Sequence, residues 1–340
     1  MITQPTSKAA FWKRLQGPHL GRRIALSLWQ RTLAKTIKRM EILEQYRGWG
    51  CDLKLWAGEG GGIAIQKEGR IILIAACHIQ YAWPLVLQFD YFFSAVESDP
   101  VPGARIVDYR RPKIHQLRSP NVKFSFTSIA EDDLPMTGYI ARYQPRLGDV
   151  VVDAGGYCGV SAYCFSRMVG ESGHVFALEP DPANFNQLSQ NIARHSLRNV
   201  TPLRLALSGR SGRAKFAADQ NLGGHLSETG LAGTVEIETI SLVDLSKQIG
   251  SPIALIKMDI EGAEQEVVES ARDWLAGSQT HFAIASYHDC DQGRRRTWAS
   301  IEPVFQSLRY QCETGFPQHL TTWATPPSCA TNAVERKALL

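Results

Sequence analysis

The chain has 340 residues, of which 44% are hydrophobic and 21% are charged, as in ordinary soluble globular proteins. This composition excludes a disordered chain, and the length predicts about two domains with a sizeable core. The net charge of +4 is too small to indicate a nucleic-acid partner, and the seven cysteines, odd in number and without a Cys-x-x-Cys pair, argue against a disulfide framework and a structural zinc site.

The positive charge is concentrated near the N-terminus, where nine lysines and arginines precede the first acidic residue, Glu41. Ile24 and Leu28 are spaced for one face of a helix, so residues 8–39 could contact an anionic membrane surface or an anionic acceptor, or could pack on the protein with their charges solvated. Lys8 and Lys13 interrupt any signal-peptide core. With the cysteine pattern, this predicts a cytoplasmic protein in a reducing compartment.

Residues 1–120 are expected to form an accessory region to which no chemistry can be assigned. Ile63–Gln66 and Ile71–Ala75 flank a short turn containing Gly69, which predicts a β-hairpin. The apolar run that follows contains Pro84 and polar residues, so it is not expected to cross a membrane.

Strands and helices alternate from about residue 121, which predicts a doubly wound α/β domain over residues 121–328 and a loose tail over 329–340. Its first unit reads LGDVVVDAGGYCGVS. Val150–Val152 predict a buried strand that ends at Asp153, and a packed helix follows over Val160–Met168. Three glycines between them, Gly155, Gly156 and Gly159, favour a tight turn against a bound small molecule.

The acid at the end of this strand indicates which small molecule binds there. A dinucleotide would present its pyrophosphate to the turn, where the Asp153 carboxylate would repel it, and the three-glycine fingerprint is broken by Ala154. S-adenosylmethionine carries no phosphate and has a cationic end, which the carboxylate attracts. The turn therefore favours S-adenosylmethionine, with a nicotinamide dinucleotide as the alternative.

The next strand, Val175–Leu178, ends at Glu179, twenty residues after Gly159. An acid at this position meets the ribose hydroxyls of a bound nucleoside, although it could also be a capping or surface residue. Asp181 caps the following helix, with Pro182 at its first position. A third strand is expected over Val200–Leu207.

The connection that follows the third strand is polar and glycine-rich, and it is long enough to cover a ligand. His225 in this connection could touch the substrate or be solvated. Ser241 and Asp244 are spaced as a capping box that opens a short helix.

A second informative stretch reads IALIKMDIEGAE, over residues 253–264. Lys257, Asp259 and Glu261 are spaced by two, so an extended strand would point all three side chains from one face at its carboxyl end, where α/β sheets bind ligands. The alternative is a structural ion pair between Lys257 and Glu261. Gly262 ends the strand, and a helix is expected over Ala263–Leu275.

The motifs DAGGYCG, LEPDPANF and IKMDIEGAE, in this order and spacing, resemble those of the FkbM family of S-adenosylmethionine-dependent methyltransferases. The resemblance covers residues 122–290. It implies a Rossmann-like class I methyltransferase fold, with a mostly parallel seven-stranded sheet that ends in a hairpin. It also implies S-adenosylmethionine as cofactor and O-methylation of a hydroxyl on a sugar, glycan or related natural product.

The resemblance carries over to individual positions. Tyr157 stands where an asparagine is more usual in the cofactor turn, and the family's Glu-x-His ending after the strand His281–Ser286 is here Ser286, Tyr287 and His288. Asp289 or Asp291 could replace the missing acid. The cofactor-binding residues so predicted are Asp153, Gly155, Gly156, Tyr157, Gly159, Glu179 and Asp259.

The predicted catalytic residues are His288, Asp259 and Glu261. A hydroxyl is a poor nucleophile, so a base is expected, and an ordinary histidine titrates near neutral pH. His288 is therefore the preferred base, with Asp259 and Glu261 orienting the acceptor or the methionine ammonium. No metal ligands are assigned. Arg294–Arg296 could hold an anionic acceptor or begin a helix. The alternatives left open are a nicotinamide-dependent oxidoreductase and a catalytically silent protein with the methyltransferase fold.

Overall fold

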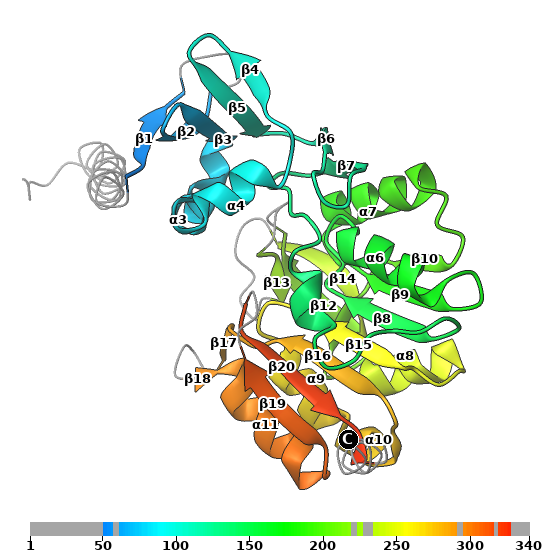
Figure 1. Cartoon of the computed structure of the whole chain (residues 1–340). Coiled ribbons are helices and arrows are strands. Elements are labelled where there is room, and N and C mark those ends of the chain that lie inside the picture. Colours follow the sequence, from blue (N-terminus) through cyan, green and yellow to red (C-terminus); the bar gives the residue numbers. More distant parts are fainter. Residues whose placement is uncertain are drawn as a thin grey trace, which may run out of the picture.

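The computed structural model describes residues 50–56, 61–218, 223–226, 234–290, 295–315 and 319–327 (Figure 1). The basic segment 8–39, the tail 329–340, Asp291 and Arg294 lie outside these residues, as do the side chains of Asp289 and Arg295. Predictions that concern them stay predictions.

A seven-stranded sheet forms the centre of the molecule, in the order β10-β9-β8-β15-β16-β20-β19. β20 runs antiparallel to both of its neighbours, whereas the pairs from β10 to β16 are parallel. This topology confirms the Rossmann-like class I methyltransferase fold with its terminal hairpin. The strands are β8 (Val150–Ala154), β9 (His174–Leu178), β10 (Val200–Leu203), β15 (Leu255–Met258), β16 (His281–Ala285), β19 (Gln311–Gly315) and β20 (Thr321–Thr325).

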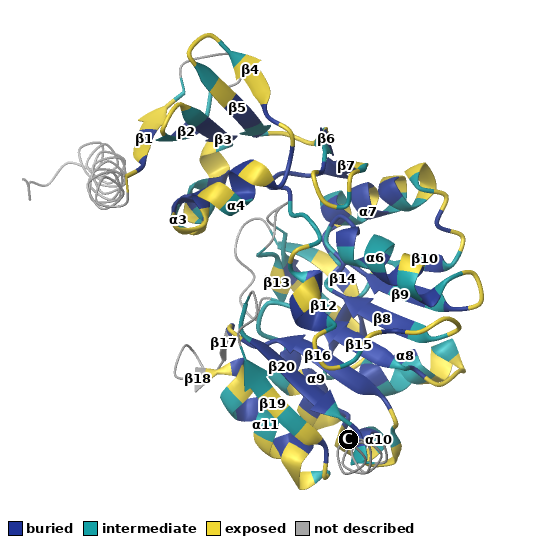
Figure 2. Cartoon of the chain, viewed as in Figure 1, coloured by how far each residue is buried: buried dark blue, intermediate teal, exposed yellow. Residues whose placement is uncertain are grey.

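Helices cover both faces of this sheet because its strands are apolar on both sides (Figure 2). Val151 and Leu255 pack with α5, α6 and α7, whereas Val152 and Ile256 pack with the remaining helices. The helices are α5 (Met136–Tyr139), α6 (Val160–Val169), α7 (Pro182–Arg194), α8 (Leu242–Ile249), α9 (Glu264–Ser270), α10 (Arg272–Gly277) and α11 (Thr297–Ser307).

The helix starts follow the predicted caps. The Asp181 carboxylate accepts hydrogen bonds from the first free N–H groups of α7, and Ser241 Oγ accepts from the Asp244 N–H at the start of α8. One helix prediction was wrong in its extent, because the stretch expected as a single helix from Ala263 is divided into α9 and α10. Ala271 lies between the two and is fully buried.

The third predicted strand was also too long. β10 ends at Leu203, and residues 206–208 form β11 in a separate four-stranded sheet, ordered β11-β14-β12-β13. A local pattern shows that residues are extended but not which strand they pair with, and here β11 pairs with β14. The strands are β11 (Ala206–Ser208), β12 (Gly212–Ala217), β13 (His225–Leu226) and β14 (Thr234–Ser241).

The N-terminal part contains a five-stranded sheet in the order β1-β2-β3-β5-β4, and the predicted hairpin is the pair β2–β3. The other elements here are two short helices, a 3-10 turn and a second hairpin. They are β1 (Asp52–Leu55), β2 (Ile63–Lys67), β3 (Arg70–Ile74), η1 (Ala76–Tyr81), α3 (Ala82–Leu87), α4 (Phe89–Ser94), β4 (Asp99–Val101), β5 (Ala104–Tyr109), β6 (Lys113–Gln116) and β7 (Lys123–Phe126). A further short pair joins β17 (Asp289–Cys290) to β18 (Arg295–Arg296).

One apolar core joins the N-terminal part to the methyltransferase sheet. It runs from β1 and the helices α3 and α4 to Cys158 and Val160 at the start of α6. Asn191 of α7 also donates a hydrogen bond from Nδ2 to the Ser125 carbonyl in β7. The helices α3 and α4 thereby lie on the side of the large sheet toward which the carboxyl ends of β8 and β9 point (Figure 1). Within the described residues, no helix combines the length and the hydropathy needed to span a bilayer.

Candidate active site

The turn after β8 has the strained backbone that the glycines predicted. Gly155 has a φ of 75°, and a Cβ there would lie 1.8 Å from the Asp259 carbonyl oxygen, so only glycine fits. Gly159 has a φ of 97° and begins α6. Tyr157 also has a positive φ, 47°, without being glycine. Such strain in a non-glycine residue is typical of functional sites.

Asp153 and Lys257 form a buried ion pair behind this turn. Lys257 Nζ lies 3.1 Å from Asp153 Oδ1 and donates to the Gly155 carbonyl at 2.6 Å, while Ser161 Oγ donates to Asp153 Oδ2. The alternative of a Lys257–Glu261 pair is therefore wrong. Asp153 and Gly159 are absent from the described residues that line the cavity, because the ion pair and α6 enclose them. Both were predicted to bind the cofactor, and this stays a prediction; the contacts of Asp153 and the positive φ of Gly159 shape the turn.

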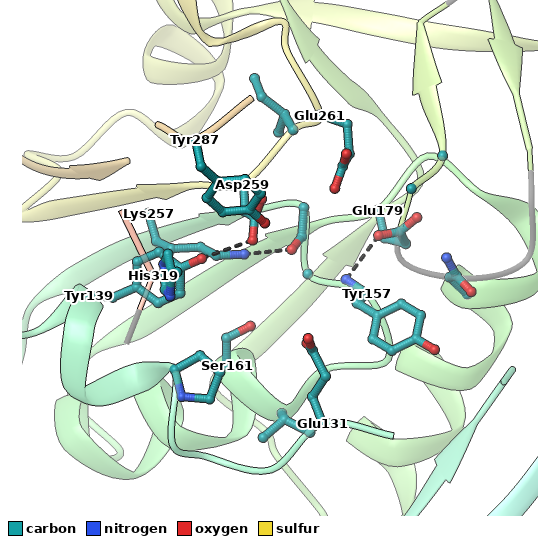
Figure 3. A pocket seen from close by; sticks show the side chains of 18 of the residues that line it. Glu131, Tyr139, Tyr157, Ser161, Glu179, Lys257, Asp259, Glu261, Tyr287 and His319 are labelled. Carbon is teal, nitrogen blue, oxygen red and sulfur yellow. Dashed lines mark hydrogen bonds between the residues drawn. The ribbon is translucent and has the colours of Figure 1, made fainter. Parts of the chain in front are cut away.

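A cavity of about 770 Å³ opens over the carboxyl ends of β8, β9 and β15 (Figure 3). Acidic side chains outnumber basic ones in its described lining. Lys257 is the only lysine or arginine among the described residues that line it. Since Asp153 already neutralises Lys257, the carboxyl groups set the charge of the cavity. The acidic residues that line it are Glu131, Asp132, Glu179, Asp259 and Glu261.

Glu179 lies at one end of the cavity, at the tip of β9 as predicted. Its two oxygens accept from the backbone N–H groups of Tyr157 and Asp181, both at 2.9 Å. Burial raises the pKa of Glu179 to about 8, although these two hydrogen bonds oppose the shift. Each oxygen keeps a lone pair that can accept from a ribose hydroxyl. Apolar side chains follow beside it, from Leu205, Leu207, Phe216 and Leu226.

Asp259 and Glu261 line the cavity, but not as neighbours on one strand face. β15 ends at Met258, and Glu261 has a left-handed φ of 55° in the turn before α9. The prediction that Lys257, Asp259 and Glu261 project from one extended strand was therefore wrong beyond Asp259. The turn between β15 and α9 nevertheless places Glu261 in the lining of the same cavity. Asp259 Oδ2 accepts from the Tyr139 hydroxyl at 2.9 Å.

His288 is enclosed by three carboxylates. Its Nδ1 lies 2.9 Å from Glu264 Oε1, and its Nε2 lies 3.5 Å from Asp259 Oδ1 and 3.6 Å from Glu261 Oε1. Burial lowers the pKa of His288, but the Glu264, Glu261 and Asp259 charges outweigh it and raise the pKa to about 11.

The ring of His288 is therefore protonated near neutral pH, and it is absent from the described lining of the cavity. A protonated imidazole cannot accept a proton, so the geometry argues against His288 as the base. It holds Asp259 and Glu261 in place instead.

Asp259, Glu264 and His288 also lie close enough together for a metal ion. Glu264 is already satisfied by protein donors, since Ile260 N–H and Gly262 N–H both donate to its carboxylate at 3.0 Å. These two hydrogen bonds fix the turn that carries Glu261.

Several lining residues were missed from the sequence. Glu131 enters from the wall opposite Asp259, and burial and the Asp259 charge raise its pKa to about 7 (Figure 3). His319 lies at the β16–β20 end, with its ring 4.7 Å from that of Tyr139. The acidic run from Glu131 to Asp133 is a sequence signal that could have indicated these residues as part of the site. No sequence signal indicates His319, because its position depends on the pairing of β16 and β20. The N-terminal part contributes Tyr81, Pro84, Leu87, Gln88, Tyr91 and Phe92.

His225, the histidine of the polar connection, is exposed, and its Nδ1 lies 3.0 Å from the Gly223 carbonyl oxygen. It does not belong to the described lining, although Gly223, Gly224 and Leu226 do. The Gly223 N–H donates to the Tyr81 hydroxyl at 2.7 Å, so this connection is tied to η1.

The residues fit S-adenosylmethionine better than a dinucleotide. The apolar end beside Glu179 suits an adenosine, whose ribose hydroxyls can donate to the carboxylate. The carboxylates of Glu131 and Asp259 suit a cationic methionine end. A pyrophosphate would instead meet uncompensated negative charge.

Comparisons with known proteins agree with this geometry. A family model described as Methyltransferase FkbM domain matches residues 153–315. Hexuronic acid methyltransferase AglP of Haloferax volcanii is 32% identical over 202 residues, which cover 54% of this chain and 81% of AglP. 2-O-methyltransferase NoeI of Sinorhizobium fredii is 29% identical over 159 residues, which cover 41% of this chain and 63% of NoeI.

Among solved structures, the crystal structure of methyltransferase FkbM from Methylobacillus flagellatus KT matches at 19% identity with a TM-score of 0.42, over 55% of this chain and 47% of that one. The family model covers the β8 turn, Glu179 and the residues around Asp259, and the relative AglP is matched over most of its length. The chain therefore belongs to the FkbM family of S-adenosylmethionine-dependent methyltransferases.

Proposed function

We propose that this protein transfers a methyl group from S-adenosylmethionine to a hydroxyl of a sugar, a glycan or a related natural product. The observation that carries the proposal is the charge of the cavity, with Glu179 at its apolar end and Glu131 and Asp259 facing each other further along. A cationic cofactor offsets the repulsion between these acids, and a neutral hydroxyl acceptor adds no negative charge.

The residues that would hold the cofactor extend over neighbouring strands of the sheet. Glu179 would accept from the ribose hydroxyls, and the backbone around Gly156 and Tyr157 would lie against the nucleoside. Glu131 and Asp259 would hold the cationic methionine end. When bound, S-adenosylmethionine supplies an electrophilic methyl group on sulfur. The cofactor roles predicted for Gly155, Gly156, Tyr157, Glu179 and Asp259 are retained in this proposal.

The acceptor would occupy the part of the cavity that the nucleoside does not fill, near the ends of β15, β16 and β20. Tyr139, Tyr287 and His319 line this part, and their rings offer flat faces of the kind that sugar rings pack against. The name of AglP, at 32% identity, also points to a sugar acceptor, and the name of NoeI, at 29% identity, points to O-methylation. An anionic acceptor, such as a sugar carboxylate, is less well matched to the acidic wall.

Transfer of label from methyl-labelled S-adenosylmethionine tests the proposal. Neutral hexosides and hexuronides serve as acceptors, and mild alkali then separates stable methyl ethers from labile methyl esters. Alkali-stable label on a sugar is expected. Alkali-labile label would show a carboxylate acceptor. Binding of the nucleoside without transfer to any fraction of host glycans, lipids and small molecules would favour a catalytically silent protein.

A further inference from the structure

We propose that His319 is the general base that takes the proton from the acceptor hydroxyl. This inference rests on the proposed O-methyl transfer and adds a catalytic residue to it. His319 lies two residues before β20, whose first residue Thr321 pairs with Ala285 at the end of β16. Because β20 is antiparallel to β16, its beginning lies at the same edge of the sheet as the carboxyl ends of the parallel strands.

The surroundings of His319 leave its ring available for proton transfer. The ring lines the cavity between two aromatic residues, with centroids 4.7 Å from Tyr139 and 6.0 Å from Tyr287. Nε2 is buried and has no hydrogen-bond partner among the described residues. We therefore assign the proton-accepting role to Nδ1, the other ring nitrogen. His288 differs in its charged surroundings, because Glu264 Oε1 lies 2.9 Å from its Nδ1 and Asp259 Oδ1 lies 3.5 Å from its Nε2.

The surroundings of His319 keep its ring neutral before the reaction and can stabilise the imidazolium that forms when the ring accepts a proton. Burial lowers the pKa of His319, and the positive charges of Lys257 and His288 act in the same direction. Asp259 opposes them and would stabilise the imidazolium once formed. The rings of Tyr139 and Tyr287 also pack against His319, and both are neutral. Burial is the main cause that raises the pKa of Tyr139 well above its usual value. For Tyr287 the Asp259 charge is the main cause, and burial acts in the same direction.

The other acids of the cavity are less suited to this role. The pKa of Asp259 is lowered, because the nearby positive charges of Lys257 and His288 outweigh the effect of burial, and its Oδ2 already accepts from Tyr139. Glu131 lies on the opposite wall, nearer Tyr157 and Ser161 (Figure 3). It is therefore better placed for the methionine end of the cofactor.

The step balances with groups already named. The acceptor oxygen forms its bond to the methyl carbon as the carbon–sulfur bond breaks, and the electron pair of that bond stays on sulfur. The hydroxyl proton moves to Nδ1 of His319 and is later released to water. The products are a methyl ether and neutral adenosylhomocysteine. No further reactant is needed.

Two measurements on the full chain test this role. The first is an NMR titration of protein labelled at histidine Cε1, with the His319 resonance assigned from its loss in His319→Asn. We expect a neutral ring near neutral pH that gains a proton only below the ordinary histidine pKa, whereas His288 stays protonated. A His319 ring that is charged at neutral pH would overturn the inference without any reference to activity.

The second measurement is methyl transfer to the sugar acceptors by His319→Asn, His319→Gln and the control His174→Gln. His174 lies at the opposite edge of the sheet, at the start of β9. Both His319 variants should lose at least about a hundredfold in kcat and the acidic limb of the kcat–pH profile. Adenosylhomocysteine affinity, which reports on folding, should stay within about twofold of wild type.

The outcomes separate the inference from the proposed function. Wild-type transfer that persists in both His319 variants, with an unchanged pH profile, contradicts the inference alone. A wild type that transfers no label to any acceptor contradicts the proposed function, and the role of His319 falls with it.

Discussion

Lys257 Nζ lies 3.1 Å from Asp153 Oδ1, and the two residues are direct partners in the register of the parallel strands β15 and β8. Both side chains are buried, at 4% and 0% exposure. The Lys257–Asp153 pair joins two motifs that are about a hundred residues apart in the chain, and through the Gly155 carbonyl it fixes the backbone of the cofactor turn.

Lys257→Met should therefore act mainly on stability. Removing one partner of a buried ion pair leaves an uncompensated charge, and this costs about 3–5 kcal/mol of unfolding free energy. Urea denaturation at neutral pH measures the loss. Asp153→Asn in the same chain removes the orphaned charge, so the double variant should recover part of the stability. Equal losses in single and double variants would contradict the account of this pair.

Glu179→Gln should weaken adenosylhomocysteine binding by about 1–3 kcal/mol, because an amide replaces a charged hydrogen-bond acceptor. The wild-type affinity should also fall as the pH drops below about 8, where the ligand-free carboxyl takes up a proton. Calorimetry over this range measures both effects. The pH dependence should be absent in Glu179→Gln, and its persistence there would assign it to another group.

Glu131→Gln separates stability from ligand binding. The folded pKa of Glu131 is raised to about 7, mainly by burial, so the wild type loses stability as the pH rises from the ordinary glutamate range through about 7. The ligand-free variant should therefore have a higher Tm than wild type, with a difference that grows with pH. Its affinity for adenosylhomocysteine, which keeps the ammonium group, should fall. Unchanged affinity would remove Glu131 from the cofactor site.

His288→Gln tests the protonated state of the enclosed histidine. A raised folded pKa contributes stability that is fully present below the ordinary value of 6.5 and is lost as the pH rises through about 11. The unfolding free energy of wild type should exceed that of the variant most below pH 6.5, and the difference should shrink toward pH 11. A difference that grows with pH would instead indicate a neutral ring.

The local elements of the site could be predicted from the sequence, because each depends on neighbouring residues. The strand ending at Asp153, the acid at Glu179 and the cap at Asp181 all follow from short patterns of apolar, glycine and capping residues. These patterns do not contain strand order. The partner of Lys257 and the partner of residues 206–208 depend on which strands lie side by side. The alternative of a Lys257–Glu261 pair and the expectation that the third strand continues to Leu207 were therefore both wrong.

The chemistry of individual groups was harder to predict than their position. His288 lies beside Asp259 and Glu261 but outside the described lining of the cavity, and its protonation depends on Glu264, which comes from the start of α9. His319 carries no motif, and the acidic run that begins at Glu131 does not show which residues it faces, so only the folded chain shows that both residues face one cavity. The same is true of Tyr81 and Tyr91 from the N-terminal part.

In the proposed function, the acidic cavity binds a cationic nucleoside cofactor at Glu179 and Glu131. The most direct measurement is calorimetric titration of the full chain with S-adenosylhomocysteine and, separately, with NAD, for wild type and for the variant Glu131→Gln/Glu179→Gln. We predict heat from adenosylhomocysteine with wild type, a strongly reduced signal with the double variant and none from NAD. Heat from NAD together with none from adenosylhomocysteine would contradict the account.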